Sequence, residues 1–173
     1  MSKSESPKGY VLTPSGWARG HVVIDSDRIA RVEAESVRMP EGSDESYIVP
    51  GFIDLHIHGG EGADYSGGEN KIRKFLRYHA RNGTVALAPT TSTAPIEVIE
   101  SSLADIERVR KKPRANEPAT LGAHLEGPFS NSGKLGAQRN MTLKGDPVLA
   151  LRWADICPLR VATVAPERAA IPS

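Results

Sequence analysis

Apolar residues in this chain fall into short blocks, and the spacing within the blocks changes along its length. Between residues 9 and 35 the blocks are brief and separated by turn signals, which predicts a β hairpin or a small meander. From residue 48 onward, strand-like apolar runs alternate with segments whose apolar residues recur at helical spacing. This alternation predicts an α/β fold preceded by a small N-terminal β layer.

Three helices are predicted, over residues 70–82, 95–112 and from Asp146 through Trp153. The first has an apolar face that ends in His79 and places Arg73 among the outward-facing basic residues. The second begins with Pro95 at its first position, with Thr93 expected as its cap. Asp146 is the expected cap of the third helix, because proline follows it directly.

Four strands are predicted within the α/β part, over residues 52–58, 84–87, 119–125 and 160–165. The first is a short apolar run with Pro50-Gly51 before it and Gly59-Gly60 after it, and we expect it to be buried. Strands separated by helices imply a parallel sheet with right-handed crossovers. This order predicts three parts: a disordered leader over residues 1–8, a β layer over 9–47, and the α/β part over 48–173.

Composition restricts the classes of function. The net charge of +1 gives no electrostatic reason to expect a nucleic-acid partner or an anionic membrane surface. No apolar stretch approaches the length of a membrane span, so no membrane partner is expected. The single cysteine, Cys157, cannot form an internal disulfide and fits a reducing compartment, which predicts a cytoplasmic location.

The first strand of the α/β part carries candidate metal ligands. Asp54, His56 and His58 share one face because side chains alternate along a strand. Two imidazoles at this spacing can point at one ion, and imidazole is a common ligand for zinc and similar metals. A His-x-His pair is a weak signal alone. Its position at a strand end before a glycine-rich loop strengthens it, because α/β barrels have their active sites there.

Glu126 is the best single candidate for a further ligand. It faces the same way as His124 on the third strand, and a carboxylate at the end of a buried strand is costly unless it is paired or metal-bound. The alternative interpretation is a salt-bridged loop carboxylate. We interpret His79 as a packed core residue rather than a ligand, and His21 as a structural or surface residue. Lys134 is either a solvated lysine or part of an anion site.

Several stretches together resemble the N-acetylglucosamine-6-phosphate deacetylase family of the amidohydrolase superfamily. They are residues 50–60 (PGFIDLHIHGG), Gly83-Thr84 with Pro89-Thr90-Thr91, residues 122–129 (GAHLEGPF) and residues 165–167 (APE). The first motif is shared across much of the superfamily. The HLEGPF stretch followed by Lys134-x-Gly136 is more particular to the deacetylases.

The resemblance implies a (β/α)8 TIM-like barrel with a small β-sandwich built from both chain termini. A full barrel needs about 250 residues, so residues 48–173 would form its N-terminal half, an incomplete barrel. The resemblance also implies a divalent metal, zinc or iron, held by Glu126 and by histidines of later strands. His56 and His58 would take part where a second metal is bound. Ala137 and Gln138 would contact the substrate, although many members carry histidine in place of Gln138.

The activity implied is metal-dependent removal of the acetyl group from N-acetylglucosamine 6-phosphate, a small-molecule amino-sugar phosphate. The family's catalytic aspartate, two later histidine ligands and a phosphate-binding arginine would lie beyond Ser173, so none of the residues here is expected to be the catalytic acid-base. The chain would then act as a homodimer or with the missing C-terminal half.

Two other interpretations remain. In the first, the chain is an inactive fragment that serves as a metal-binding or interaction module. In the second, it is a ring-hydrolysing amidohydrolase similar to dihydroorotase. The HLEGPF motif argues against the ring hydrolase, as does the lack of lysine between Arg160 and Glu167, where a modified lysine ligand would be expected.

Overall fold

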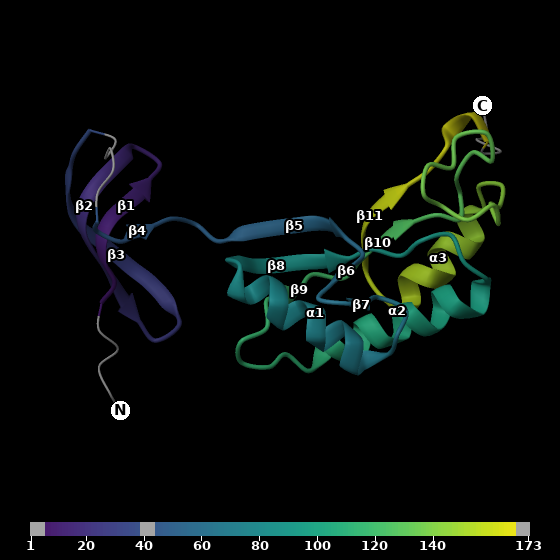
Figure 1. Cartoon of the computed structure of the whole chain (residues 1–173), viewed down its shortest axis with the longest axis horizontal. Coiled ribbons are helices and arrows are strands. Elements are labelled where there is room, and N and C mark those ends of the chain that lie inside the picture. Colours follow the sequence, from purple (N-terminus) through teal and green to yellow (C-terminus); the bar gives the residue numbers. More distant parts are fainter. Residues whose placement is uncertain (1–5, 39–43, 169–173) are drawn as a thin grey trace. The chain divides into compact units, whose positions relative to one another are not determined.

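The computed structural model describes residues 6–38 and 44–168 (Figure 1). The chain divides between Pro50 and Gly51 into two compact units, which we describe separately. The leader predicted over residues 1–8 lies largely outside the described residues, and a strand already begins at Lys8. None of the helices in the described part of the chain is long and apolar enough to cross a membrane.

The first unit is a four-stranded sheet. Its strands are β1 (Lys8–Thr13), β2 (Gly16–Asp25), β3 (Arg28–Ser36) and β4 (Tyr47–Ile48). The spatial order is β3-β2-β1-β4, with β1, β2 and β3 antiparallel and β4 parallel to β1. The predicted meander is therefore confirmed. His21 pairs with Glu33 of the neighbouring strand, at 3.0 Å between Nε2 and a carboxylate oxygen, in agreement with its structural interpretation.

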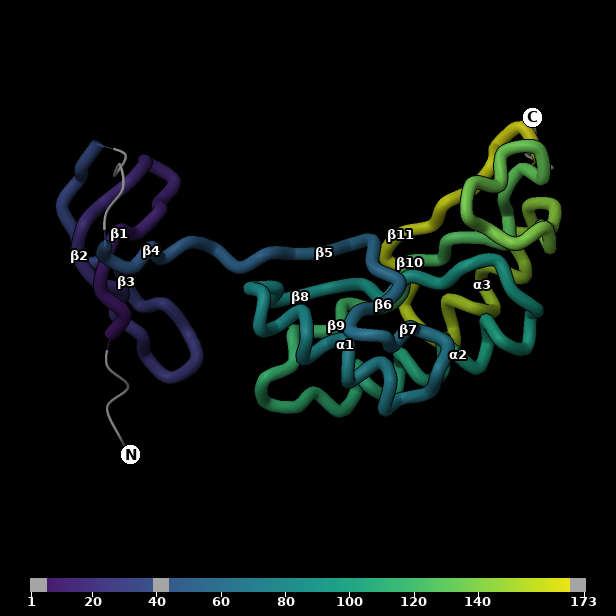
Figure 2. Tube along the Cα trace, in the orientation of Figure 1, coloured from purple at the N-terminus to yellow at the C-terminus, as the bar shows by residue number. Residues whose placement is uncertain are grey.

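The second unit alternates strands and helices. Its larger elements are β5 (Phe52–Ile57), α1 (Glu69–Arg81), β8 (Thr84–Pro89), α2 (Ile96–Lys111), β9 (Ala119–Thr120), β10 (Ala123–Glu126), α3 (Pro147–Ile156) and β11 (Leu159–Thr163). A small hairpin, β6 (Gly59–Gly60) with β7 (Ala63–Asp64), follows β5, and the short helix η1 (Pro166–Arg168) follows β11. Figure 2 traces this path along the chain.

Apart from the β6–β7 hairpin, the paired strands of this unit are parallel, as predicted. β5, β8 and β9 form one sheet in that order, β10 pairs with β11, and a parallel bridge between Thr90 and His124 joins the two groups. The single strand predicted over residues 119–125 is wrong in one respect, because it breaks into β9 and β10 around Gly122. This glycine has φ of +139°, and a Cβ there would lie 2.2 Å from the carbonyl oxygen of Pro158.

The core lies between the strands and the helices that cover one of their faces, as Figure 1 shows for α1 and α2. Its fully buried members come from α1, α2, α3, β8 and β10 and from Cys157 just after α3, and the largest are Ile72, Phe75, Leu76, Leu87, Ile99, Leu103, Ile106, Leu125 and Trp153. The apolar faces predicted for the helices are therefore the faces that pack into this core. Arg73 departs from the prediction, because it is 1% exposed and not on the solvent side.

The expectation that β5 is buried is wrong. Phe52 and Ile53 are each 65% exposed, and Leu55 is 46% exposed. Among the described residues β5 pairs only with β8, so it is an edge strand with an open side. An apolar run indicates that a strand can be buried on two faces, but the covering elements come from elsewhere in the chain.

The two cap predictions had different outcomes. Asp146 caps α3, its carboxylate accepting from the Leu149 amide at 3.0 Å, as predicted. Thr93 does not cap α2, because Pro95 occupies the N-cap position and the helix begins at Ile96. The Thr93 amide instead donates to the side-chain oxygen of Gln138 at 2.6 Å.

Candidate metal centre

Three of the predicted site residues meet at the C-terminal ends of β5 and β10. The Nε2 atoms of His56 and His58 lie 3.2 and 2.9 Å from one carboxylate oxygen of Glu126, and 3.2 Å from each other. In the described part of the chain, these residues form the group of histidine, cysteine and acidic side chains close enough to share an ion. The alternation read from the sequence put His56 and His58 on one face, and the structure brings Glu126 of β10 close to both.

The donor spacing fits a single divalent cation. Two ligand atoms about 2.1 Å from an ion are about 3.0 Å apart at a right angle and about 3.4 Å apart at the tetrahedral angle. The three separations of 2.9–3.2 Å are close to the right-angle value. A facial set of two imidazoles and one carboxylate is a donor set suited to divalent transition metals.

The second ring nitrogen of His58 is held by its surroundings. Its Nδ1 lies 3.1 Å from the carbonyl oxygen of Thr90 and 3.2 Å from the hydroxyl oxygen of Ser92. A carbonyl only accepts, so Nδ1 is the donor in this contact, and Nε2 is the nitrogen that faces Glu126. This is the arrangement in which a metal-binding histidine is oriented by a backbone carbonyl.

His124 is a site residue that sequence reasoning missed. It is 3% exposed, and its ring packs edge-on against that of His56, with centroids 4.8 Å apart. Its Nδ1 donates to the carbonyl oxygen of Leu55 at 3.0 Å, and its Nε2 accepts from the hydroxyl of Thr163 at 2.8 Å. Its position two residues before Glu126 was visible in the sequence, but its partners on the other strands were not.

The environment of His124 favours the neutral ring. Burial lowers the pKa of this imidazole, with a smaller contribution in the same direction from nearby His56. The two hydrogen bonds match one neutral tautomer, since the carbonyl of Leu55 needs a donor and the hydroxyl of Thr163 can serve as one. A neutral ring adds no positive charge beside the candidate ligands.

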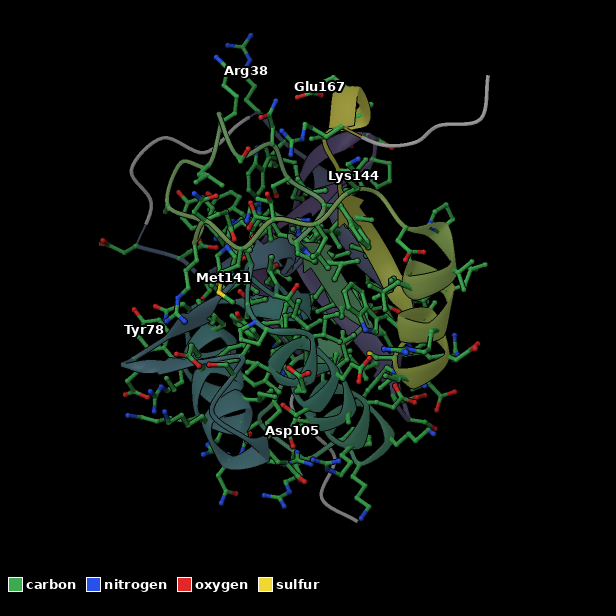
Figure 3. The ribbon with its side chains drawn as sticks, turned by 90° about the vertical axis from the view of Figure 1, so that its right-hand side faces the viewer. Arg38, Tyr78, Asp105, Met141, Lys144 and Glu167 are labelled. Carbon is green, nitrogen blue, oxygen red and sulfur yellow. The ribbon has the colours of Figure 1, made fainter. Side chains whose placement is uncertain are left out.

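A pocket of about 300 Å³ opens beside Glu126. Its lining comes from the loop after β10 and from the segment after β11, and includes Ser130, Asn131, Lys134, Gln138 and Glu167. Those two segments are joined by bonds from Ala165 to Phe129 and from Asn131 to Glu167. Figure 3 shows Glu167 and Lys144 at this end of the unit, with Asp105 of α2 at the other.

The two predicted substrate contacts differ in placement. Gln138 lines the pocket and is half-buried, whereas Ala137 is exposed on the loop and is not among the lining residues. Because the Gln138 side-chain oxygen accepts from Thr93, its NH2 group remains available to donate. Lys134 lines the pocket with an exposed side chain.

His79 lies outside the cluster, as predicted. Its Nε2 faces the carbonyl oxygen of Gly59 at 3.1 Å, and its ring contacts those of Phe75 and Tyr78. Asp54 also stays out of the ligand group, because its carboxylate accepts from the His56 amide at 3.0 Å. Both side chains have local structural partners.

The fold and the site define an α/β protein whose imidazole and carboxylate side chains converge at the carboxyl ends of parallel strands. No family model matches the chain. It is 30% identical over 169 residues to the N-acetylglucosamine-6-phosphate deacetylase of Bos taurus, an alignment that covers 92% of this chain and 41% of that protein. It is 31% identical over 168 residues to the N-acetylgalactosamine-6-phosphate deacetylase of Escherichia coli O157:H7, covering 91% and 43%.

Solved structures give the same result. The N-acetyl-D-glucosamine-6-phosphate deacetylase of Mycobacterium smegmatis matches with a TM-score of 0.74 at 27% identity, over 92% of this chain and 46% of that one. The Thermotoga maritima enzyme matches with a TM-score of 0.73 at 27% identity, over 95% and 43%. The chain is thus related to the N-acetylglucosamine-6-phosphate deacetylases and resembles a deacetylase-type amidohydrolase. It spans less than half the length of the curated relatives it matches.

Proposed function

We propose that His56, His58 and Glu126 bind one divalent cation, zinc or iron. The observation that carries this proposal is the convergence of both Nε2 atoms on one oxygen of Glu126, within 3.2 Å. Three such atoms, with the His58 tautomer fixed by a carbonyl, form a site that needs no rearrangement to accept an ion. A divalent ion there supplies Lewis acidity, which polarises an amide carbonyl and activates water.

We further propose that the site serves hydrolysis of the acetamido group of an N-acetylated amino sugar 6-phosphate, giving the free amine and acetate. Support comes from the relatives, which are deacetylases of N-acetylglucosamine or N-acetylgalactosamine 6-phosphate. The pocket beside Glu126 would receive the substrate, with the NH2 group of Gln138 as a donor. Ala137 would contribute through the loop backbone, because its side chain offers no polar group.

In this proposal, the parallel strands β5, β8, β9/β10 and β11 correspond to the first four strands of a (β/α)8 barrel. Parallel pairing, helices between consecutive strands and ligands at the carboxyl ends all fit that fold. The catalytic acid-base would come from later strands. Within the described residues, no aspartate joins the ligand cluster.

An alternative is that the 173 residues bind metal or a partner without turnover. The exposed apolar side chains of β5 favour this alternative, because such a surface is typical of an interface. Turnover of N-acetylglucosamine 6-phosphate by the purified chain tests whether these residues are sufficient for hydrolysis. We expect acetate release to be at background for the chain alone, because the described residues supply cation ligands without a catalytic aspartate. Sustained turnover that is lost on Glu126→Ala would contradict this expectation.

The cation site itself is tested by metal content. We expect Glu126→Ala to abolish stoichiometric Zn²⁺ or Fe²⁺ binding, measured by elemental analysis after dialysis, because it removes the charged ligand. His79→Ala is the matched control, since that histidine lies in the same unit but outside the cluster. Equal metal content in the two variants would refute this choice of ligands.

A further inference from the structure

The end of β5, which carries His56 and is followed directly by His58, is not held by a regular strand ladder. β5 pairs with β8 at residues 52–54 and at Ile57, and the register shifts twice, between Phe52 and Ile53 and again between Asp54 and Ile57. Leu55 and His56 fall within this irregular stretch. An interruption of the ladder changes the direction in which the side chains of that stretch point. The backbone groups there lose their ladder partners and need other hydrogen-bond partners.

Side chains supply some of those partners. The carboxylate of Asp54 accepts from the His56 amide at 3.0 Å, and the hydroxyl of Thr90 accepts from the Ile57 amide at 2.8 Å. Thr90 is fully buried, and its hydroxyl also lies 3.2 Å from the carbonyl oxygen of Ala88. These contacts hold the backbone within the irregular stretch at His56 and at its end at Ile57.

His124 supplies the partner for Leu55. Its Nδ1 donates to that carbonyl at 3.0 Å from a ring that is 3% exposed. The same ring lies edge-on against His56, at 4.8 Å between centroids and 79° between planes. His124 therefore contacts the backbone just before His56 as well as the His56 ring itself.

The ring of His124 is not available as a ligand. Its Nε2 accepts from Thr163 on β11, while Nδ1 is committed to β5. The residue thus joins β5 to β11 from its own position on β10. Two residues further along β10 is Glu126, so one short strand carries both the carboxylate and the histidine that fixes the imidazole opposite it.

We propose that His124 is a positioning residue of the cation site. Its Nδ1–H fixes the Leu55 carbonyl, the backbone group just before His56, so that the His56 Nε2 atom faces Glu126. This inference rests on the cation site proposed above and adds a residue that does not touch the ion. Partners that orient a ligand typically change metal affinity 10- to 100-fold when they are removed.

Two isosteric variants separate the roles of the ring nitrogens. An asparagine amide reaches the place of Nδ1, and a glutamine amide reaches the place of Nε2. We expect His124→Asn to bind Zn²⁺ within about threefold of the native chain, and His124→Gln to bind it at least tenfold more weakly. Affinity would be measured by competition with a chromophoric chelator. Bound Co²⁺ would show a changed visible absorption spectrum in His124→Gln only, because its coordination geometry is altered.

Two control variants distinguish the possible causes of a loss of Zn²⁺ affinity. Ile106→Ala, a fully buried change in α2, shows what loss of core packing alone does to affinity. Glu126→Ala tests the site itself, and native-like binding by that variant would overturn the proposed cation site. If Glu126→Ala abolishes binding, three results overturn the positioning role alone. These are native affinity in His124→Gln, equal losses in the Asn and Gln variants, or an equal loss in Ile106→Ala.

Discussion

Glu126 is the least exposed of the three candidate ligands, with 19% of its side chain accessible against 41% for His58 and 55% for His56. It is also the residue on which both imidazoles converge. A partly buried carboxylate is stabilised when cations or donors surround it, and here the surroundings are two imidazoles. The carboxylate thus sets where an ion would sit, and the rings complete the donor set.

Cys157 gives a prediction at the residue scale. Burial raises the pKa of its thiol to about 12, and its side chain is fully buried. Since the thiolate is the nucleophile, we expect alkylation by iodoacetamide at pH 8 to be at least ~100-fold slower in the native chain than in urea. Mass spectrometry of the labelled chain would measure both rates, and the sequence contains no other cysteine. Native labelling at the urea rate would contradict this burial.

The residue scale also shows how far the sequence could predict the site. Strand alternation put His56, His58 and Glu126 on usable faces, and the structure brings them together. It put His124 on the same face as Glu126 without showing its function. The role of that ring depends on Leu55 and Thr163, which are distant in sequence. Alternation describes one strand at a time, whereas such contacts depend on how strands align.

At the scale of elements, a buried charge network joins α1 to the segment that follows α2. Arg73 donates to Glu69, to Glu117 at 2.6 Å and to the carbonyl oxygen of Lys112 at 3.0 Å. Arg77 donates to the second oxygen of Glu117 at 3.0 Å. The side chains of Arg73 and Glu117 are 1% and 3% exposed, so water screens their charges little.

We expect Arg73→Met to lower the free energy of unfolding by about 3 kcal/mol, because it leaves the buried carboxylate of Glu117 without its closest partner. Arg81→Met is the matched control. It breaks an exposed pair with Glu61 and should cost less than about 1 kcal/mol. Urea unfolding followed by circular dichroism measures both. Equal losses in the two variants would show that the Arg73 network adds no more stability than a surface pair.

Helix periodicity predicted the bounds of α1, α2 and α3 closely, yet it put Arg73 on the solvent side. The error has a physical cause. A helical pattern shows which face is apolar, but a position beside that face is buried or exposed according to what packs against it. Here the covering segment carries Glu117, some 40 residues later in the chain. The same limit applies to β5, whose apolar pattern could not name a covering element.

At the scale of the whole molecule, the open side of β5 is the main feature that the sequence did not predict. Phe52, Ile53 and Leu55 present apolar surface on a strand that pairs only with β8 among the described residues. An edge strand with exposed backbone groups and apolar side chains is a template for pairing with another chain. In the proposed barrel, further strands and helices would cover this surface, and the curated relatives are more than twice as long as the region that matches.

We therefore expect the purified 173-residue chain to self-associate as its concentration rises, and Ile53→Lys to reduce that association by placing a charge on the open strand. Light scattering coupled to size-exclusion chromatography would measure the mass at several concentrations. Val148→Lys is the control, because that valine is 78% exposed but lies on the helix α3 and not on a strand edge. A decrease of similar size in both variants would attribute association to general surface hydrophobicity. A decrease in Ile53→Lys alone would identify β5 as the surface through which this chain meets another polypeptide.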